Sequence, residues 1–130
     1  MIVLDTHVLI FDALQPSRLS ARARKAVDQG AASQELACSD ISLWEIAMLI
    51  ARDRLEPGMD ANRFIDDLIT VRRVEVMPIT PDIAVLSQSD SFYHGDPADR
   101  LIAATAMINS ARLVTSDEKL RKIKNLVTIW

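Results

Sequence analysis

Two carboxylates and a proline, followed by small apolar residues, make up the stretch Asp96-Pro97-Ala98-Asp99-Arg100-Leu101-Ile102-Ala103-Ala104-Thr105-Ala106. Asp96 followed by Pro97 is typical of a helix start, because the carboxylate caps the first N–H groups and proline needs no partner there. Counting on from Asp99, one helix face holds Ile102, Ala103 and Ala106. Small alanines allow a sheet to pack closely against this face. Asp99 therefore stands at the rim of a buried stripe, either as a cap or as a ligand.

Short apolar runs alternate with helical patterns along the chain. We expect strands at 1–4, 35–39, 74–78, 113–114 and 126–129. We expect helices at 8–14, 21–29, 60–71, 81–88 and 97–110, and a short one after Ser116-Asp117. A further helix should run from residue 39 or 42 to about residue 54. Gly30 should end the helix at 21–29. This alternation indicates parallel βαβ units. The sequence therefore predicts an α/β fold, a single-domain three-layer α/β/α sandwich over residues 1–130 with about five strands.

Composition narrows the class of protein. With 130 residues and 49% hydrophobic content, the chain can bury one sizeable core. Its formal charge of -3 argues against binding nucleic acid through bulk positive charge, although a bound cation can supply that charge locally. The single cysteine, Cys38, cannot form an internal disulfide and is expected to be a small buried residue of a strand. No apolar run is long enough to span a bilayer, and no signal peptide is evident, so we expect a cytoplasmic protein without a membrane partner.

Four acids fall where the predicted topology places a ligand site. Asp5 ends the first strand and Asp117 follows the strand at 113–115, and ligands of open parallel sheets bind beyond the carboxyl ends of the strands. Asp99 lies in the first turn of its helix, and Glu45 lies inside the most apolar helix. Each has an ordinary alternative as a helix cap, and Ser42-Leu43-Trp44-Glu45 matches a capping box. Helices that follow strands begin at one edge of the sheet, so caps and ligand site would share one location.

Clustered carboxylates need a counter-charge. Two unit charges about 4 Å apart repel by about 4 kcal/mol at an effective dielectric constant of 20. Such a cluster either raises the pKa of its members or binds a cation. Carboxylate oxygens suit Mg²⁺ or Mn²⁺, and no Cys/His spacing in the chain supports zinc. A magnesium ion that keeps its waters can orient a phosphate and activate a water molecule.

Four segments follow one another along the chain: Val3-Leu4-Asp5-Thr6-His7, Ser42-x-x-Glu45, 96–106, and Leu113-Val114-Thr115-Ser116-Asp117. Together they resemble the PIN-domain family, and most closely its short bacterial VapC-type toxins. The resemblance implies an Mg²⁺-dependent endoribonuclease in which Asp5, Glu45, Asp99 and Asp117 are the catalytic, metal-binding acids, with Mn²⁺ able to replace Mg²⁺. It also implies a peripheral or outer-sphere role for Asp96, and hydroxyls near the acids at Thr6, Thr115 and Ser116.

The same resemblance implies partners. A toxin of this type cleaves RNA through one or two metal ions that activate water, and a small antitoxin protein silences it by wrapping the early helices and occupying the acidic pocket. Homodimers are implied, and operator DNA is contacted only through the antitoxin. Three alternatives stay open: a housekeeping RNA-processing nuclease, a non-catalytic member that binds RNA or protein, and a small-molecule Mg²⁺ phosphatase. A common phosphatase pattern places a second Asp two residues after the first, where this chain has His7.

Several other side chains have two interpretations. His7 adjoins Asp5 and either contacts substrate or packs at the bend, and His94 is a weaker candidate of the same kind. Arg100 stands four residues after Asp96, so it forms either a helical ion pair or a phosphate contact. For Trp44, packing or a partner groove is favoured over base stacking.

Overall fold

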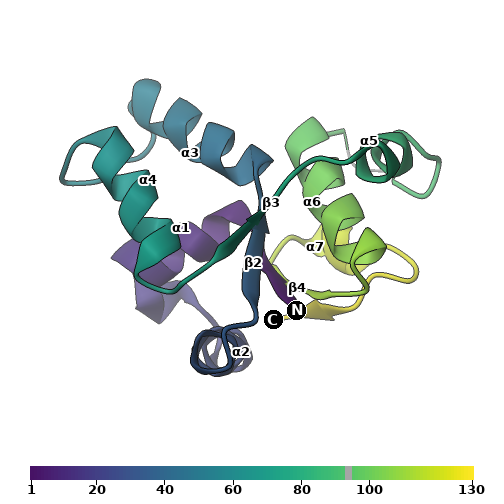
Figure 1. Ribbon diagram of the computed structural model, residues 1–130, viewed down its shortest axis with the longest axis horizontal. Helices are drawn as coiled ribbons and strands as arrows, with labels where there is room; N and C mark the ends of the chain where they lie inside the picture. Colours follow the sequence, from purple (N-terminus) through teal and green to yellow (C-terminus); the bar gives the residue numbers. More distant parts are fainter. Residues whose placement is uncertain (93–94) are drawn as a thin grey trace.

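A five-stranded parallel sheet forms the centre of the structure, a computed structural model that describes residues 1–92 and 95–130 (Figure 1). The strands are β1 (Ile2–Leu4), β2 (Leu36–Ser39), β3 (Glu75–Met77), β4 (Arg112–Val114) and β5 (Thr128–Ile129). Their order across the sheet is β3-β2-β1-β4-β5, so the first strand of the chain is the middle one. Val3 of β1 lies opposite Ala37 of β2 on one side and Leu113 of β4 on the other. The predicted α/β fold with five strands is confirmed.

Helices cover both faces of the sheet. They are α1 (Thr6–Leu14), a 3-10 turn η1 (Pro16–Arg18), α2 (Ala21–Ala32), α3 (Ile41–Ala51), α4 (Ala61–Thr70), α5 (Pro81–Ser87), α6 (Pro97–Ile108) and α7 (Glu118–Arg121). In Figure 1, α1, α2 and α4 lie on one side of the sheet and α5, α6 and α7 on the other, while α3 follows the end of β2. Within the described ranges, no helix is long and apolar enough to cross a membrane.

The two faces of the sheet are packed with different side chains. Because neighbouring residues of a strand point to opposite faces, Ile2 and Leu4 of β1 face α1, α2 and α4, whereas Val3 faces α6. We call the first side the large-residue face; its buried residues include Leu36, Val8, Val27, Ile46, Phe64 and Leu68. We call the second side the alanine face; its buried residues include Ala37, Ile102, Ala103, Ala104, Ala106 and Leu113. Cys38 is buried on the large-residue face, as predicted, and burial raises the pKa of its thiol to about 12.

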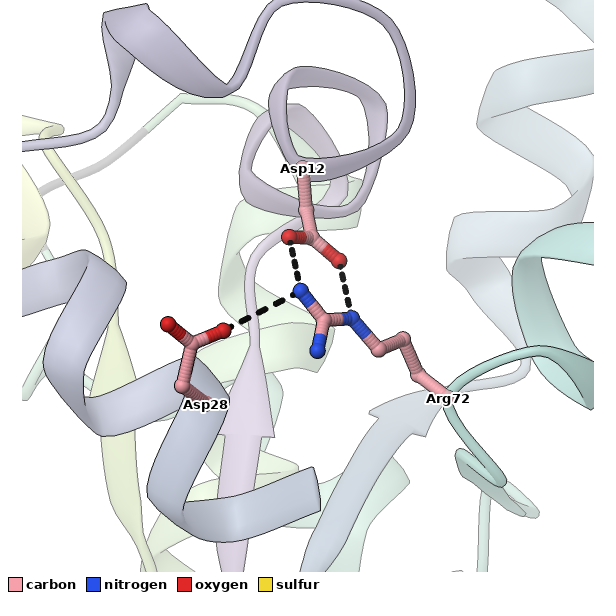
Figure 2. A network of polar contacts seen from close by, with 3 residues as sticks. All are labelled: Asp12, Asp28 and Arg72. Carbon is pink, nitrogen blue, oxygen red and sulfur yellow. Dashed lines mark hydrogen bonds and ion pairs between the residues drawn. The ribbon is translucent and has the colours of Figure 1, made fainter. Parts of the chain in front are cut away.

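A charged network holds the large-residue face together (Figure 2). Arg72, in the turn after α4, donates two parallel hydrogen bonds to Asp12 of α1, from Nη2 to Oδ1 at 2.9 Å and from Nε to Oδ2 at 3.0 Å. The same Nη2 donates to Asp28 Oδ1 of α2 at 3.1 Å. The Asp12 side chain is only 12% exposed, whereas Asp28 is 56% exposed. One guanidinium therefore ties three segments together, mainly through its bidentate pair with Asp12.

Helix ends are where the sequence prediction was least accurate. Helix α2 does not stop at Gly30 but continues to Ala32, and Gly30 is buried inside it. A Cβ atom at Gly30 would lie 2.5 Å from Leu36 Cδ2, so the glycine allows α2 to approach β2 closely. Helix α3 ends at Ala51 rather than near Arg54.

The helices end without glycine. Four of them are followed by a residue with a left-handed backbone: Gln34 (φ 56°), Asp53 (φ 55°), Arg73 (φ 54°) and Ser110 (φ 50°) after α2, α3, α4 and α6. In each case the next N–H bonds back to the fifth residue before it, as in Arg54 N to Leu49 O at 2.9 Å and Ala111 N to Ala106 O at 2.8 Å. This is the Schellman motif, which usually has glycine at the left-handed position. The usual stop signal is therefore missing from the sequence.

Candidate functional site

The acids Asp5 and Asp117 lie together at the carboxyl edge of the sheet. Leu4 and Val114 are partners in the β1–β4 pairing, and Asp5 N donates to Val114 O at 3.1 Å. Asp5 caps α1 and Asp117 caps α7, whose Lys119 N and Leu120 N donate to Asp117 Oδ1 at 2.8 and 3.0 Å. The capping interpretation is thus correct for both residues, and the caps lie at the predicted ligand edge.

A threonine hydroxyl connects these two acids. Asp5 is only 6% exposed and accepts from Thr6 N at 2.7 Å and from Thr115 Oγ1 at 2.6 Å. The Thr115 hydroxyl in turn accepts from Asp117 N at 3.1 Å. Each Asp5 oxygen therefore has a fixed donor, and Thr115 fixes the position of Asp117 relative to Asp5.

Glu45 reaches the site from α3 through a second hydroxyl. Thr6 Oγ1 donates to Glu45 Oε1 at 2.5 Å and lies 2.9 Å from Ser42 Oγ. The capping box predicted for Ser42 and Glu45 is wrong, because α3 begins at Ile41 and Asp40 is its N-cap residue. Ser42 and Glu45 share one face of the first turns, and that face points at α1. The contact between Ser42 and Thr6 was not predicted from the sequence. The spacing of three residues between Ser42 and Glu45 was the signal that could have indicated it.

Helix α6 supplies the remaining acids. Asp96 caps the helix, and its Oδ1 accepts from Ala98 N at 2.9 Å. Asp99 is half-buried in the first turn, and Ile102, Ala103 and Ala106 below it are completely buried, as the stripe predicted. Close packing of α6 on the alanine face thus brings Asp99 to the edge where the other acids lie.

The charges of these acids act on one another. Burial, together with neighbouring negative charge, raises the pKa of the Asp99 carboxyl from 3.8 to about 8. The neighbours responsible are Asp5, Asp96, Asp117 and Glu45. Burial also raises the pKa of Asp5 and of Glu45, and the hydrogen bonds from Thr115 and Thr6 respectively oppose that rise. The predicted acids therefore form one electrostatic cluster, which we call the acid cluster: Asp5, Glu45, Asp96, Asp99 and Asp117.

Charge and donor chemistry suit the acid cluster to a divalent cation. All of its donors are carboxylate oxygens, which hard cations prefer, and a cation would relieve the repulsion felt at Asp99. As the side chains stand, residues 1–92 and 95–130 contain no group of three or more His, Cys, Asp or Glu in position to hold a metal. Hydrogen bonds to Asp5, Glu45 and Asp117 direct their oxygens toward protein donors. The cluster therefore fits such an ion by charge, and its carboxylates would have to turn to bind it.

Other predicted residues surround the acid cluster. His7 is exposed in the first turn of α1, and its charge lowers the pKa of both Asp5 and Glu45. Arg100 is half-buried on α6, and Ser116 is exposed between Thr115 and Asp117. Trp44 is 58% exposed and lines a cavity of about 460 Å³ with Met48. His94 lies outside the described residues.

Comparison with known proteins identifies the family to which this chain belongs. Residues 2–126 match the PIN domain, and the chain is a member of the PIN-domain family. The resemblance seen in the four sequence segments is thereby confirmed.

Among individual relatives, the chain is 36% identical to Ribonuclease VapC22 of Mycobacterium tuberculosis (strain ATCC 25618 / H37Rv) over 132 residues, which cover 99% of this chain and 98% of that protein. Two solved structures share the fold. VapBC2 from Rickettsia felis bound to a DNA fragment from its promoter aligns with a TM-score of 0.72 at 20% identity, covering 98% of this chain and 97% of that chain. FitAcB from Neisseria gonorrhoeae aligns with a TM-score of 0.66 at 22% identity, covering 98% and 96%.

Proposed function

We propose that this protein is a metal-dependent endoribonuclease, the toxin of a VapBC-type toxin–antitoxin pair, which cleaves RNA phosphodiester bonds. The observation that carries the proposal is the convergence of four carboxylate charges on Asp99, whose pKa is raised first by burial and then by those charges. A site that concentrates negative charge in this way is suited to a divalent cation rather than directly to an anionic substrate. The 36% identity to a protein named as a ribonuclease supports the same activity.

Asp5, Glu45, Asp99 and Asp117 would hold Mg²⁺, or Mn²⁺ in its place, with Asp96 at the periphery. A divalent ion held by these residues would supply positive charge to the phosphate and would make a water molecule easier to deprotonate. In the metal-free protein at neutral pH, Asp99 retains its proton because its pKa is about 8. Thr115 and Thr6 hold the carboxylates of Asp5 and Glu45 in place through bonds of 2.6 and 2.5 Å, so they act as positioning residues.

The partners follow from the same class. We propose a small antitoxin protein that covers the acid cluster, a homodimer of this chain, and contact with operator DNA only through the antitoxin. The support comes from structural neighbours that are complexes: VapBC2 from Rickettsia felis, bound to promoter DNA, and a toxin–antitoxin complex from Klebsiella pneumoniae with a TM-score of 0.63 at 22% identity. RNA in the cytoplasm would be the substrate.

The decisive experiment is cleavage of structured RNA by the purified chain with Mg²⁺, with EDTA, and with the variants Asp5→Asn, Asp99→Asn and Asp117→Asn. We expect EDTA to abolish cleavage and each variant to lose about 100-fold or more in rate, equivalent to about 2.7 kcal/mol of transition-state stabilisation. Asp82→Asn is the matched control, because Asp82 is an exposed acid in the first turn of α5, outside the acid cluster. Activity that survives both Asp5→Asn and Asp117→Asn would refute the site assignment.

The same assay separates the alternative functions. Phosphate release from small phosphoesters without RNA cleavage would indicate a phosphatase. RNA binding without any cleavage would indicate a non-catalytic member. A toxin, in contrast to a housekeeping nuclease, should be inhibited by the product of a short reading frame next to its own.

A further inference from the structure

A cavity of about 630 Å³ opens beside the acid cluster, between α1 and the end of α3. Its walls come from two helices that both carry acids of the cluster: α1, which Asp5 caps, and α3, which contains Glu45. On α1, Asp5 is the N-cap and His7 and Phe11 line the cavity; on α3, Leu49 lines it one turn after Glu45. The cavity therefore lies next to the acid cluster along both helices.

Two arginines line the outer end of this cavity, Arg18 and Arg54. Arg18 ends η1, directly after α1, and its Cζ lies 4.2 Å from the centroid of the Phe11 ring. Stacking of this kind uses the flat face of the guanidinium and keeps the N–H groups in its plane available for an anion. The Phe11 ring lies 6.1 Å from the His7 ring, centroid to centroid, so the Arg18 guanidinium is within about 10 Å of the His7 end of the cavity.

The backbone fixes the position of Arg54. Asp53 adopts a left-handed conformation with φ of 55°, Asp53 N donates to Ile50 O at 3.1 Å, and Arg54 N donates to Leu49 O at 2.9 Å. These two bonds form the Schellman motif that ends α3. Arg54 therefore projects from a closed helix end, not from a loose loop.

The nearby carboxylates are directed elsewhere. Within residues 1–92 and 95–130, no ion pair joins Arg18 or Arg54 to an acid. Glu56 also lines the cavity, but its Oε1 accepts from Gly58 N at 3.0 Å in its own loop. Asp12 of α1 is paired with Arg72 and does not line this cavity, as the pair in Figure 2 and the lining residues together indicate. The positive charge of the cavity is thus left for a ligand from solution.

We propose that this cavity binds backbone phosphates of the RNA strand beside the bond that is cut, with Arg18 and Arg54 as the phosphate-binding residues. The inference rests on the proposed ribonuclease function and adds to it the path of the substrate away from the acid cluster. A chain with a formal charge of -3 lacks the overall positive charge that would hold RNA, so a local pair of arginines has to do so. About 10 Å corresponds to roughly three stacked nucleotides at about 3.4 Å each, so one strand can reach both the acid cluster and the arginines.

Binding is tested separately from cleavage. The probe is a fluorescein-labelled single-stranded RNA of twelve nucleotides, added with Mg²⁺ to the Asp99→Asn protein, in which cleavage is suppressed. Addition of Arg18→Gln and Arg54→Gln should weaken binding roughly ten- to a hundredfold at low salt. It should also reduce the slope of log K against log salt by about 1.4, the value for two single-strand phosphate contacts. The matched control is Arg22→Gln with Arg24→Gln, two exposed arginines of α2 outside the cavity, and should change binding less than about twofold.

Further arms decide what a negative result means. Arg18→Lys with Arg54→Lys keeps the charge and should retain most of the salt dependence, and thermal unfolding checks that every variant is folded. In the otherwise native protein, the glutamine pair should raise KM for RNA with little change in kcat. Equal RNA binding by the glutamine pair and the α2 control would overturn the proposal even if the protein cleaves RNA. Loss of binding without any cleavage by the native chain would sustain the proposal and refute the ribonuclease function.

A protein ligand is the remaining competitor for this cavity. The affinity of the same variants for a labelled peptide of ten glutamates tests whether the cavity binds an acidic protein segment instead. If the glutamine pair loses this peptide but keeps RNA, the proposal is overturned and the cavity belongs to an acidic protein segment. If it loses RNA while peptide binding stays weak throughout, the proposal stands.

Discussion

The large-residue face and the alanine face of the sheet are packed by different means. On the alanine face, the stripe of α6 that faces the sheet includes Ala103 and Ala106, and both are completely buried. On the large-residue face, α1 and α4 leave a cavity of about 410 Å³ between them, lined by residues such as Leu9, Leu14, Phe64 and Val71. One face is tightly filled by small side chains, and the other is open and held by the Arg72 network.

This difference in packing affects how the acid cluster is positioned and where a ligand can bind. Since Asp99 belongs to α6, the tight face places a member of the acid cluster with little freedom. The large-residue face carries α1. The first residues of α1 complete the acid cluster, and the rest of the helix lines the cavity that contains Arg18 and Arg54. The alanine face therefore fixes the position of Asp99, whereas the large-residue face provides room for ligands.

Among single substitutions at constant pH, the largest effect on stability should come from adding the same larger side chain to each face. Ala103→Leu should lower the free energy of unfolding by about 1–3 kcal/mol, because the added carbons have no space between α6 and the sheet. Ala13→Leu should change it by less than about 0.5 kcal/mol, because Ala13 is exposed and lines the cavity between α1 and α4. Urea unfolding measures both. An equal loss of unfolding free energy for the two variants would show that the two faces are equally tightly packed.

The next effect concerns the network that holds the open face. Asp12→Asn should cost about 1–2 kcal/mol of unfolding free energy, because it removes the charge that pairs bidentately with Arg72 in a largely buried position. Asp28→Asn is the matched change on the same guanidinium and should cost less than about 0.5 kcal/mol, because Asp28 is 56% exposed. Urea unfolding at two salt concentrations distinguishes them. A larger loss for Asp28→Asn would contradict the assignment of Asp12 as the main partner.

A third prediction uses the pH dependence of stability to test the raised pKa of Asp99, which lies on the helix that covers the alanine face. The pKa of Asp99 is about 8 in the folded protein and 3.8 ordinarily, so between these values the folded state holds a proton that the unfolded state has released. The stability of the metal-free protein should therefore fall as pH rises from about 4 to about 8, by at most about 1.4 kcal/mol per pH unit for one proton. Asp99→Asn should flatten this dependence and Asp82→Asn should not. Thermal unfolding in EDTA across this range gives the slopes, and equal slopes for native protein and Asp99→Asn would refute the raised pKa.

The smallest effect should be the same on both faces. Gln34→Gly after α2 and Ser110→Gly after α6 should each raise the free energy of unfolding by about 0.5–1 kcal/mol, because glycine adopts the left-handed conformation without strain. Ser33→Gly is the control, since Ser33 has φ of -89° and glycine there adds only flexibility. Urea unfolding resolves such differences. A loss of stability at Gln34 or Ser110 would mean that their side chains contribute more than the strain costs.

The elements of the fold could be predicted because their signals are local. The apolar run at 1–4 and the Asp96-Pro97 start required no knowledge of the partners, and both elements are present within two residues of expectation. The end of α2 could not be predicted, because Gly30 serves the approach of α2 to Leu36 and not the end of the helix. The order of the strands was equally inaccessible, since any strand of a buried parallel sheet has the same apolar character.

The candidate site divides in the same way. Asp5 and Asp117 were expected to meet because each follows a strand, and the β1–β4 pairing brings them together. Glu45 was expected there because its helix follows a strand, and the resemblance supported this, although its local pattern equally suited a cap on Ser42. The direction of Glu45 depends on α3 starting at Ile41, and nothing in the sequence distinguished that start from Ser39 or Ser42. The cavity with Arg18 and Arg54 is purely tertiary, because it requires two helix ends that are far apart in sequence.

The central position of β1 has a consequence for how the protein is made. Its neighbour β4 is synthesised more than a hundred residues later, and the hydrogen bond between Thr115 and Asp5 spans 110 positions of the chain. A ribosome therefore releases the start of the chain long before the strand that completes the middle of the sheet, and such distant pairings form slowly. The acid cluster cannot assemble until Asp117 has emerged, so a nascent chain that stops short of β4 would carry its acids without a working centre.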